Sequence, residues 1–264
     1  MPSVFHKGTQ PFGPLTLLTR PPTLIPRPET EQWTSDLADK LLRRAASYNI
    51  SSFKLLDLCT GSGCIPLLLC HLLDIQGINT AALGIDISPS ACQLARDNYA
   101  STSLSLNSSV DIQQVDIFDD NCWQSVAMAF RGPKLRHIVA EQDSLQLDVV
   151  TANPPYIPMD QWLRLPPEVK DWEDPIALLG DPLSRGGDDC TASSRGTKGL
   201  TFYRRIRDLL SSPNVLSPHS ILAMEVGDGQ AGDVTKIFRR DFGRAEIWKD
   251  LWGKERAVFI FGKK

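Results

Sequence analysis

The sequence lacks the features that mark several common classes of protein. Its 28 Lys and Arg residues form no basic run, and the net charge at pH 7 is −3. Proteins that hold long nucleic acids by their phosphates usually gather positive charge in a patch or stripe. No apolar run reaches the ~18 residues of a membrane span. Residues 1–10 have neither a signal-peptide core nor an Arg-rich presequence pattern. We therefore expect no direct binding of long nucleic acid and no membrane segment.

The cysteines are not arranged for a cross-linked or zinc-binding fold. Cysteine occurs at six positions: Cys59, Cys64, Cys70, Cys92, Cys122 and Cys190. None of them forms a C-x-x-C pair, whereas zinc ligands usually come in close pairs. Disulfide frameworks belong to small secreted domains. We therefore expect no metal site, and reduced, mostly buried thiols in an intracellular protein.

Apolar patterning predicts strands that alternate with helices over most of the chain. Strands are expected at 53–59, 82–87, 110–115, 147–151, 220–226, 245–251 and 257–261, and helices at 31–47, 64–73, 89–99, 199–211 and 234–241. Helical crossovers between strands imply a mostly parallel α/β sheet, Rossmann-like and seven-stranded, that is covered on both faces. The last two strands have no helix between them, so we expect an antiparallel C-terminal hairpin.

The remaining segments set the expected domain boundaries. Residues 1–30 are rich in proline, which disfavours helices and central strands, so they are expected to lie on the domain as a strap or short hairpin. The domain itself is expected over 31–264, with Thr30 capping its first helix. Residues 184–197 are rich in Gly, Ser and Asp, which predicts a disordered loop. No secondary structure is predicted for the polar segment 130–146.

The turn after the first expected sheet strand is suited to ligand binding. Asp57 ends the strand, and the turn from Thr60 to Gly63 follows, in which Gly61 and Gly63 let the backbone approach a ligand closely. Asp57 is expected to face the crevice and to suit a cation such as a methionyl ammonium group. Backbone N–H groups of the next helix add donors. A dinucleotide fingerprint would have Gly where Pro66 stands, and no P-loop lysine follows.

Two more acidic residues come at the ends of the next two strands. Asp86, followed by Ile87, can accept both hydroxyls of a ribose. Asp116 can accept the exocyclic amine of adenine while Ile117 or Phe118 flanks the ring. Open α/β sheets bind ligands in the crevice at the carboxyl ends of their strands. Three acids on three consecutive strands therefore indicate a nucleoside site there.

The apolar strand 147–151 leads into a stiff turn, Asn153-Pro154-Pro155-Tyr156. The side-chain oxygen of Asn153 and the carbonyl of Pro154 can accept the two hydrogens of an –NH₂ group. Tyr156 offers a ring that can stack on a planar amide or base. Methyl transfer to such a nitrogen depends mainly on positioning, and the sequence shows no obvious general base, since Asn153 is not one.

Together these motifs resemble those of class I amino-methyltransferases, which act on adenine, on cytosine amines or on glutamine amides. Three further blocks narrow the resemblance: Leu24–Glu31 (LIPRPETE), Glu168–Leu178 (EVKDWEDPIAL), and Leu222–Gly227 (LAMEVG) with Gln230. With these blocks the chain resembles the HemK-type peptide chain release factor glutamine methyltransferases over about residues 8–262.

The resemblance implies a specific reaction and a specific partner. The methyl donor would be S-adenosylmethionine, the product S-adenosylhomocysteine, and the acceptor the glutamine of the Gly-Gly-Gln loop of a class I release factor. Asn153 and Pro154 would bind the amide, Pro155 and Tyr156 would pack around it, and Arg27 and Glu29 would shape the mouth of the site with Thr30. Arg27 can equally be paired with a glutamate.

The family also implies an N-terminal helical domain, which this sequence is expected to lack. Eukaryotic relatives with these blocks are typically organellar, so we expect a mitochondrial location, with the cytoplasm as the alternative, and a monomer. Three other functions stay open at this point: methylation of an adenine amine in nucleic acid, a non-catalytic adaptor that binds S-adenosylmethionine, and a nicotinamide-dependent oxidoreductase. Pro66 and the Asn153–Tyr156 turn disfavour the oxidoreductase.

Overall fold

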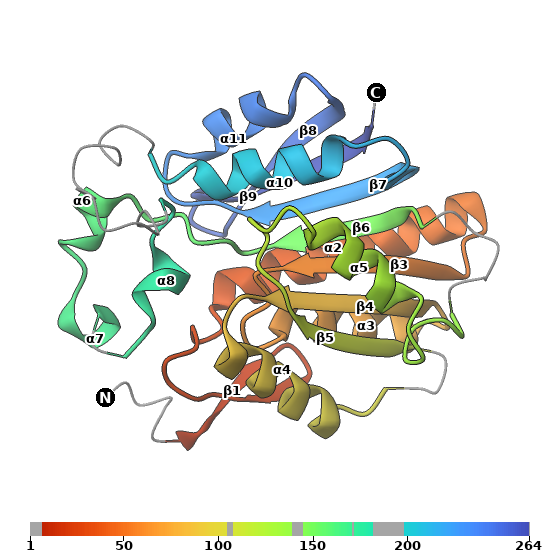
Figure 1. Ribbon diagram of the computed structural model, residues 1–264, viewed down its shortest axis with the longest axis horizontal. Coiled ribbons are helices and arrows are strands. Elements are labelled where there is room, and N and C mark those ends of the chain that lie inside the picture. The colour runs from red at the N-terminus through yellow and green to blue at the C-terminus, as the bar shows by residue number, and fades with distance from the viewer. Residues whose placement is uncertain (1–6, 105–107, 139–144, 171, 182–197, 264) are drawn as a thin grey trace.

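Figure 1 shows the computed structural model of the chain, which describes residues 7–104, 108–138, 145–170, 172–181 and 198–263. The large sheet contains β3 (Ser52–Leu58), β4 (Asn79–Asp86), β5 (Ser109–Gln114), β6 (Leu147–Ala152), β7 (Leu216–Glu225), β8 (Phe242–Lys249) and β9 (Glu255–Lys263). The helices are α2 (Pro28–Tyr48), α3 (Cys64–Asp74), α4 (Pro89–Ser101), α5 (Cys122–Phe130), α6 (Met159–Trp162), α7 (Pro167–Lys170), α8 (Pro175–Leu178), α10 (Thr201–Ser211) and α11 (Ala231–Phe238). Among the described residues, no helix is both long and apolar enough to cross a membrane.

The seven strands follow the order β5-β4-β3-β6-β7-β9-β8. From β5 to β7 every neighbouring pair is parallel, and β9 is antiparallel to both β7 and β8. This confirms the mostly parallel seven-stranded sheet and its antiparallel C-terminal hairpin. The carboxyl ends of the parallel strands meet at one edge, which we call the catalytic edge because the candidate site lies there. The segment with α6, α7 and α8 lies beyond this edge, at the left of Figure 1.

Helices cover both faces of the sheet, and each face has its own apolar core. On one face, α2 buries Trp33, Leu37 and Leu41 at helical spacing, and α3 and α4 join the same cluster. On the other face, α5, α10 and α11 pack around residues such as Tyr203 and Phe238. The central strands are buried on both sides, which explains their continuous apolar runs.

The N-terminal segment forms a small hairpin on the domain. Of the two expected forms, a strap or a short hairpin, the structure shows the hairpin. β1 (Thr9–Phe12) and β2 (Leu15–Leu18) pair antiparallel in a separate two-stranded sheet. Phe12 and Leu17 are buried in the same cluster as α2 and α3. The hairpin is therefore anchored by apolar contacts despite its high proline content.

The start of α2 differs from the prediction. The helix begins at Pro28, and Arg27 is the N-cap residue, with no side-chain cap. Proline is favoured in the first turn because its missing N–H would have no partner there. Thr30 therefore lies inside the helix, and its hydroxyl donates to Glu225 instead of capping. The expected Thr30 cap was wrong, whereas Ser88 caps α4 by accepting from the N–H of Ala91.

Other boundaries differ by a few residues. Helix α5 and the three four-residue helices α6, α7 and α8 were not predicted. α5 was not predicted because its nine residues follow a run of polar turn residues and lead into the unassigned segment 130–146. The structure describes residues 130–138 and 145–146 of that segment, and Leu135 lies in a run of turns with its side chain buried. Residues 139–144 and the loop 184–197 lie outside the described residues. Helix α11 begins at Ala231, three residues before the predicted start, because Gln230 ends the preceding turn.

Candidate active site

A cavity of about 630 Å³ opens at the catalytic edge. Its walls come from the turns after β3, β4, β5 and β6, the segment that precedes α2, and the start of α8. This is the crevice in which open α/β sheets bind their ligands, and the volume lies in the usual range for small-molecule sites.

Gly61 and Gly63 in the turn between β3 and α3 have different roles. Both have positive φ, +55° for Gly61 and +78° for Gly63. A Cβ on Gly61 would meet nothing within 4 Å, and this residue lines the cavity with Thr60. A Cβ on Gly63 would lie 3.1 Å from the Cβ of Ala95 on α4, so Gly63 permits close packing of that helix. Of the two predicted glycines, Gly61 therefore faces the ligand space.

Asp86 lies at the end of β4 on the cavity wall, with both carboxylate oxygens fixed by backbone donors. The N–H of Gly61 donates to Oδ2 at 2.8 Å, and the N–H of Ser88 donates to Oδ1 at 2.9 Å. Burial raises the pKa of Asp86, and the backbone hydrogen bonds oppose this shift. The neighbouring Ile87 is 41% exposed and also lines the cavity. The turn after β3 and the end of β4 are thus held together by this carboxylate.

Asp57 occupies a different place from the one expected. It is fully buried behind the β3–α3 turn and is not among the residues that line the cavity. Its two oxygens accept from the hydroxyls of Thr60 and Thr151, each at 2.6 Å. Burial raises the pKa of Asp57 to about 7. The carboxylate thus supports the turn from beneath, whereas the sequence predicts that it contacts a cation directly.

The turn after β5 supplies the predicted apolar wall. Asp116 lines the cavity, and its Oδ1 accepts from the N–H of Phe118 at 2.9 Å. Ile117 is buried and also lines the cavity. The ring of Phe118 packs edge-on against Phe202 of α10, with centroids 5.1 Å apart, and both rings reach the cavity. An acid and an apolar wall therefore stand together, which is the arrangement that the sequence predicts after this strand.

The turn after β6 presents Asn153 and Pro155 to the same cavity, whereas Pro154 is buried and does not line it. Within the described part of the chain, the side-chain amide of Asn153 has no hydrogen-bond partner. Tyr156 does not line the cavity. Its hydroxyl donates to Oε1 of Glu225 at 3.3 Å, so its ring is turned toward β7. Of the four motif residues, Asn153 and Pro155 therefore stand on the cavity wall.

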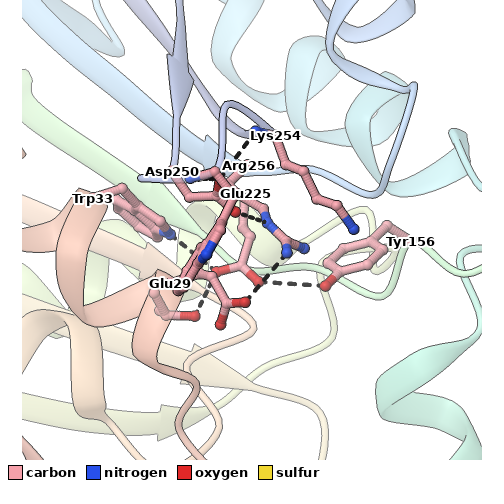
Figure 2. A network of polar contacts seen from close by, with 9 residues as sticks. Glu29, Trp33, Tyr156, Glu225, Asp250, Lys254 and Arg256 are labelled. Atoms are coloured by element: carbon pink, nitrogen blue, oxygen red, sulfur yellow. Dashed lines mark hydrogen bonds and ion pairs between the residues drawn. The ribbon is translucent and has the colours of Figure 1, made fainter.

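The sequence predicts no individual role for Glu225, which belongs to the block Leu222–Gly227. In the structure it lies at the centre of a buried network (Figure 2). It ends β7 and is 5% exposed. Its Oε2 accepts from the Thr30 hydroxyl at 2.5 Å and from Nε1 of Trp33 at 2.9 Å, while Oε1 accepts from Tyr156. Burial raises the pKa of Glu225, and the same cause raises the pKa of Tyr156. Glu225 thus joins the first turns of α2 to the motif after β6.

Gln230 fixes the other side of Tyr156. Its Oε1 accepts from the N–H of Gly227, and its Nε2 donates to the carbonyls of Tyr156 and Lys198, all at 2.8 Å. Every hydrogen-bonding group of this amide except one acceptor position is therefore in use. The side chain ties the end of β7 to the motif, so both the backbone and the hydroxyl of Tyr156 are held.

Arg27 and Glu29 belong to two different ion pairs. The guanidinium of Arg27 lines the cavity and donates to both oxygens of Glu173, at 2.6 and 2.9 Å. The pairing with a glutamate considered for Arg27 is therefore present. Glu29 accepts from Arg256 of β9 at 3.2 Å and does not line the cavity. Glu173 belongs to the block after the Asn153–Tyr156 motif, 146 residues from Arg27 in the chain. Sequence spacing therefore could not show which glutamate pairs with Arg27.

Comparisons with known proteins point to one family. A scan against protein-family models found no match. The chain is 29% identical over 261 residues to the release factor glutamine methyltransferase of Bacillus cereus. The alignment covers 98% of this chain and 76% of that protein. It is 31% identical over 238 residues to the protein of the same name from Thermodesulfovibrio yellowstonii. That alignment covers 90% of this chain and 68% of that protein. Among solved structures, the hMettl16 catalytic domain in complex with MAT2A 3′UTR hairpin 6 aligns with a TM-score of 0.54 and 15% identity, over 94% of this chain and 76% of that chain. At that identity the last likeness concerns the fold alone.

Proposed function

Because this chain belongs to the family of release factor glutamine methyltransferases, we propose that it methylates the side-chain amide of the Gly-Gly-Gln glutamine in a class I release factor. S-adenosylmethionine is the methyl donor and S-adenosylhomocysteine the second product. One observation carries the proposal: the side-chain amide of Asn153, which has no hydrogen-bond partner among the described residues, belongs to a residue that lines the same cavity as Gly61 and Asp86. An acceptor amide and a nucleoside can therefore meet in one space.

The residues on the cavity wall fit S-adenosylmethionine, which supplies an electrophilic methyl group when bound. Gly61 leaves open space where a side chain would stand. Asp86 is oriented by two backbone N–H groups and keeps lone pairs for the two ribose hydroxyls. Ile87, Ile117 and Asp116 would hold the adenine ring and its amine. Thr60 and Gly63 shape the turn, and Asp57 acts on the amino-acid end of the donor through that turn rather than by contact.

The motif after β6 would hold the acceptor. The Asn153 side-chain oxygen would accept one amide hydrogen from within the cavity, with Pro155 on the wall and Tyr156 fixed behind it. The Pro154 carbonyl stays the predicted acceptor of the second hydrogen, although Pro154 itself is buried and does not line the cavity. The new N–C bond would form while the bond between the methyl carbon and the donor's sulfur breaks, which leaves S-adenosylhomocysteine with the bonding electron pair. The amide nitrogen would lose one proton to solvent, because Asn153 cannot act as a base. Positioning accounts for most of the rate increase in such a site. Arg27 and Glu29 would shape the mouth through their ion pairs.

Several narrower statements belong to the same proposal. The chain would act as a monomer and would not bind long nucleic acid directly. The methyltransferase domain would extend over 31–264, preceded by the strap 1–30. A mitochondrial location stays a prediction of the resemblance, with the cytoplasm as the alternative, and the bacterial relatives reported above give it no support.

The test offers three acceptors with a labelled methyl donor: an intact class I release factor, its Gln→Ala variant in the Gly-Gly-Gln loop, and an adenine-rich single strand. We expect label on the intact factor alone, located by mass spectrometry on the glutamine. Label on the strand would favour the adenine-amine alternative. Equal label on the Gln→Ala variant would contradict the assigned acceptor. Calorimetry with S-adenosylmethionine, S-adenosylhomocysteine and NAD would separately test the nucleoside assigned to the cavity.

A further inference from the structure

The turn between β8 and β9 stands at the catalytic edge. Ala257 of β9 pairs with Glu225 at the carboxyl end of β7, so β9 begins at this edge. β7 runs parallel to β6, and β6 ends one residue before Asn153. The turn Asp250–Lys254 therefore lies on the same side of the molecule as the acceptor motif, although it is distant from that motif in sequence.

Asp250 holds this turn in one conformation. Its side chain is buried, and Oδ1 accepts from the N–H groups of Trp252 and Lys254 at 2.9 and 3.0 Å. Its Oδ2 accepts from Nε of Arg256 at 2.8 Å. The backbones of Asp250 and Lys254 are also bonded, and Gly253 takes φ +79° to close the turn. The two residues at its tip are therefore presented on a fixed backbone.

Those two residues are large, apolar and exposed. Leu251 is 86% exposed and Trp252 is 75% exposed. Tight turns between strands usually carry polar residues, glycine or proline. Single exposed apolar residues need no explanation, but two adjacent ones on a rigid turn are typical of an interaction site. Tryptophan is enriched among the residues that contribute most to protein interfaces.

An ion-pair chain connects the turn to the site (Figure 2). Arg256 donates to Asp250 and to Glu29. Glu29 lies in the first turn of α2, two residues after Arg27, which lines the cavity. The turn is thus continuous with the surface that surrounds the mouth of the site.

We propose that Leu251 and Trp252 form a docking tip that contacts the body of the release factor while its glutamine occupies the site. This proposal rests on the proposed function. An acceptor glutamine on a folded protein can reach Asn153 only if that protein covers the catalytic edge. The tip stands at that edge, with its backbone ordered before binding, so little conformational entropy is lost when it docks. It would therefore contribute to recognition of the whole factor and not to the methyl-transfer step.

The experiment compares two double variants. The test variant is L251A/W252A. The matched control is I75A/Y48A, which also removes one exposed aliphatic and one exposed aromatic side chain, 60% and 55% exposed. Tyr48 ends α2 before β3, and Ile75 follows α3 before β4, so both lie at the opposite edge of the sheet. Each protein is assayed on an intact release factor and on a short peptide that contains Gly-Gly-Gln, after melting curves confirm folding.

On the intact factor, we expect L251A/W252A to raise KM by roughly tenfold, in the range of interface hot spots, with kcat nearly unchanged. On the peptide, kcat/KM should match that of the unaltered chain, and the control should behave normally on both. Unchanged KM on the factor, or equal losses on factor and peptide, would overturn the docking role. If the unaltered chain labels neither acceptor, the proposed function fails and the docking role with it.

Discussion

The buried carboxyl group of Asp57 makes the stability of this protein depend on pH in a defined direction. Its pKa is about 7 in the folded chain, against an ordinary value of 3.8. The folded state therefore binds the proton more tightly than the unfolded state. The stabilising contribution is fully present below about pH 4 and is lost as the pH rises through about 7. Asp57 should thus make the protein less stable at pH 8 than at pH 5.

The magnitude follows from the two pKa values. Each pH unit between them is worth about 1.36 kcal/mol, so complete ionisation costs about 4 kcal/mol. About 3 kcal/mol of this cost falls between pH 5 and pH 8, since the unfolded carboxyl is largely ionised at pH 5 already. This is a large fraction of the ~5–15 kcal/mol that stabilises a typical domain.

The assay is urea unfolding of the unaltered chain and of Asp57→Asn at several pH values from 5 to 8. The Asn side chain has nearly the same shape and can bond to both Thr60 and Thr151 without a charge. Subtracting the two curves removes the contributions of other buried acids, such as Glu225, which both proteins share. We expect the difference in the free energy of unfolding to favour Asp57→Asn increasingly as the pH rises. A difference that stays constant from pH 5 to 8 would refute the reasoning.

Three further substitutions test separate parts of the site. Asp86→Ala should weaken binding of S-adenosylmethionine by about 1–3 kcal/mol, measured by calorimetry, because hydrogen bonds to a charged group are lost; unchanged affinity would remove the ribose role. Asn153→Ala should abolish most turnover while the cofactor affinity stays within a few-fold, since Asn153 is assigned to the acceptor; normal turnover with poor cofactor binding would reverse that assignment. Glu225→Leu should cost about 1–3 kcal/mol of stability in urea unfolding because the N–H of Trp33 loses its acceptor. Glu225→Gln keeps an acceptor and should cost less, so equal losses would show that the network contributes through packing alone.

The sequence predicted the fold better than it predicted contacts. Strand positions follow from apolar runs, and the crevice follows from the rule that ligands bind at the carboxyl ends of parallel strands. These inferences placed Gly61, Asp86 and Asn153 on the wall of one cavity. Each depends on local pattern and sheet topology, which the order of the elements largely determines.

Contacts between distant segments could not be read in the same way. Glu225 accepts from Thr30, which is 195 residues away in the chain. The Thr30 hydroxyl is therefore bonded to this carboxylate and does not cap α2 as expected. Asp57 ends a strand as predicted, but hydroxyls from Thr60 and Thr151 hold it behind the turn. Side-chain direction at a strand end depends on such partners. The spacing of residues in a single sequence does not predict which distant side chains will be these hydrogen-bond partners.

The position of β9 between β7 and β8 determines the order in which this part of the sheet can assemble and open. Within the described residues, β8 pairs with β9 alone, so it cannot join the sheet until β9 has paired with β7. Opening of the β7–β9 pairing would release both strands together and separate Arg256 from Glu29. In native-state hydrogen exchange, the amides bonded between β8 and β9 should therefore exchange no more slowly than those bonded between β7 and β9. The two strands would form one cooperative unit, whose opening would also expose Glu225 to water.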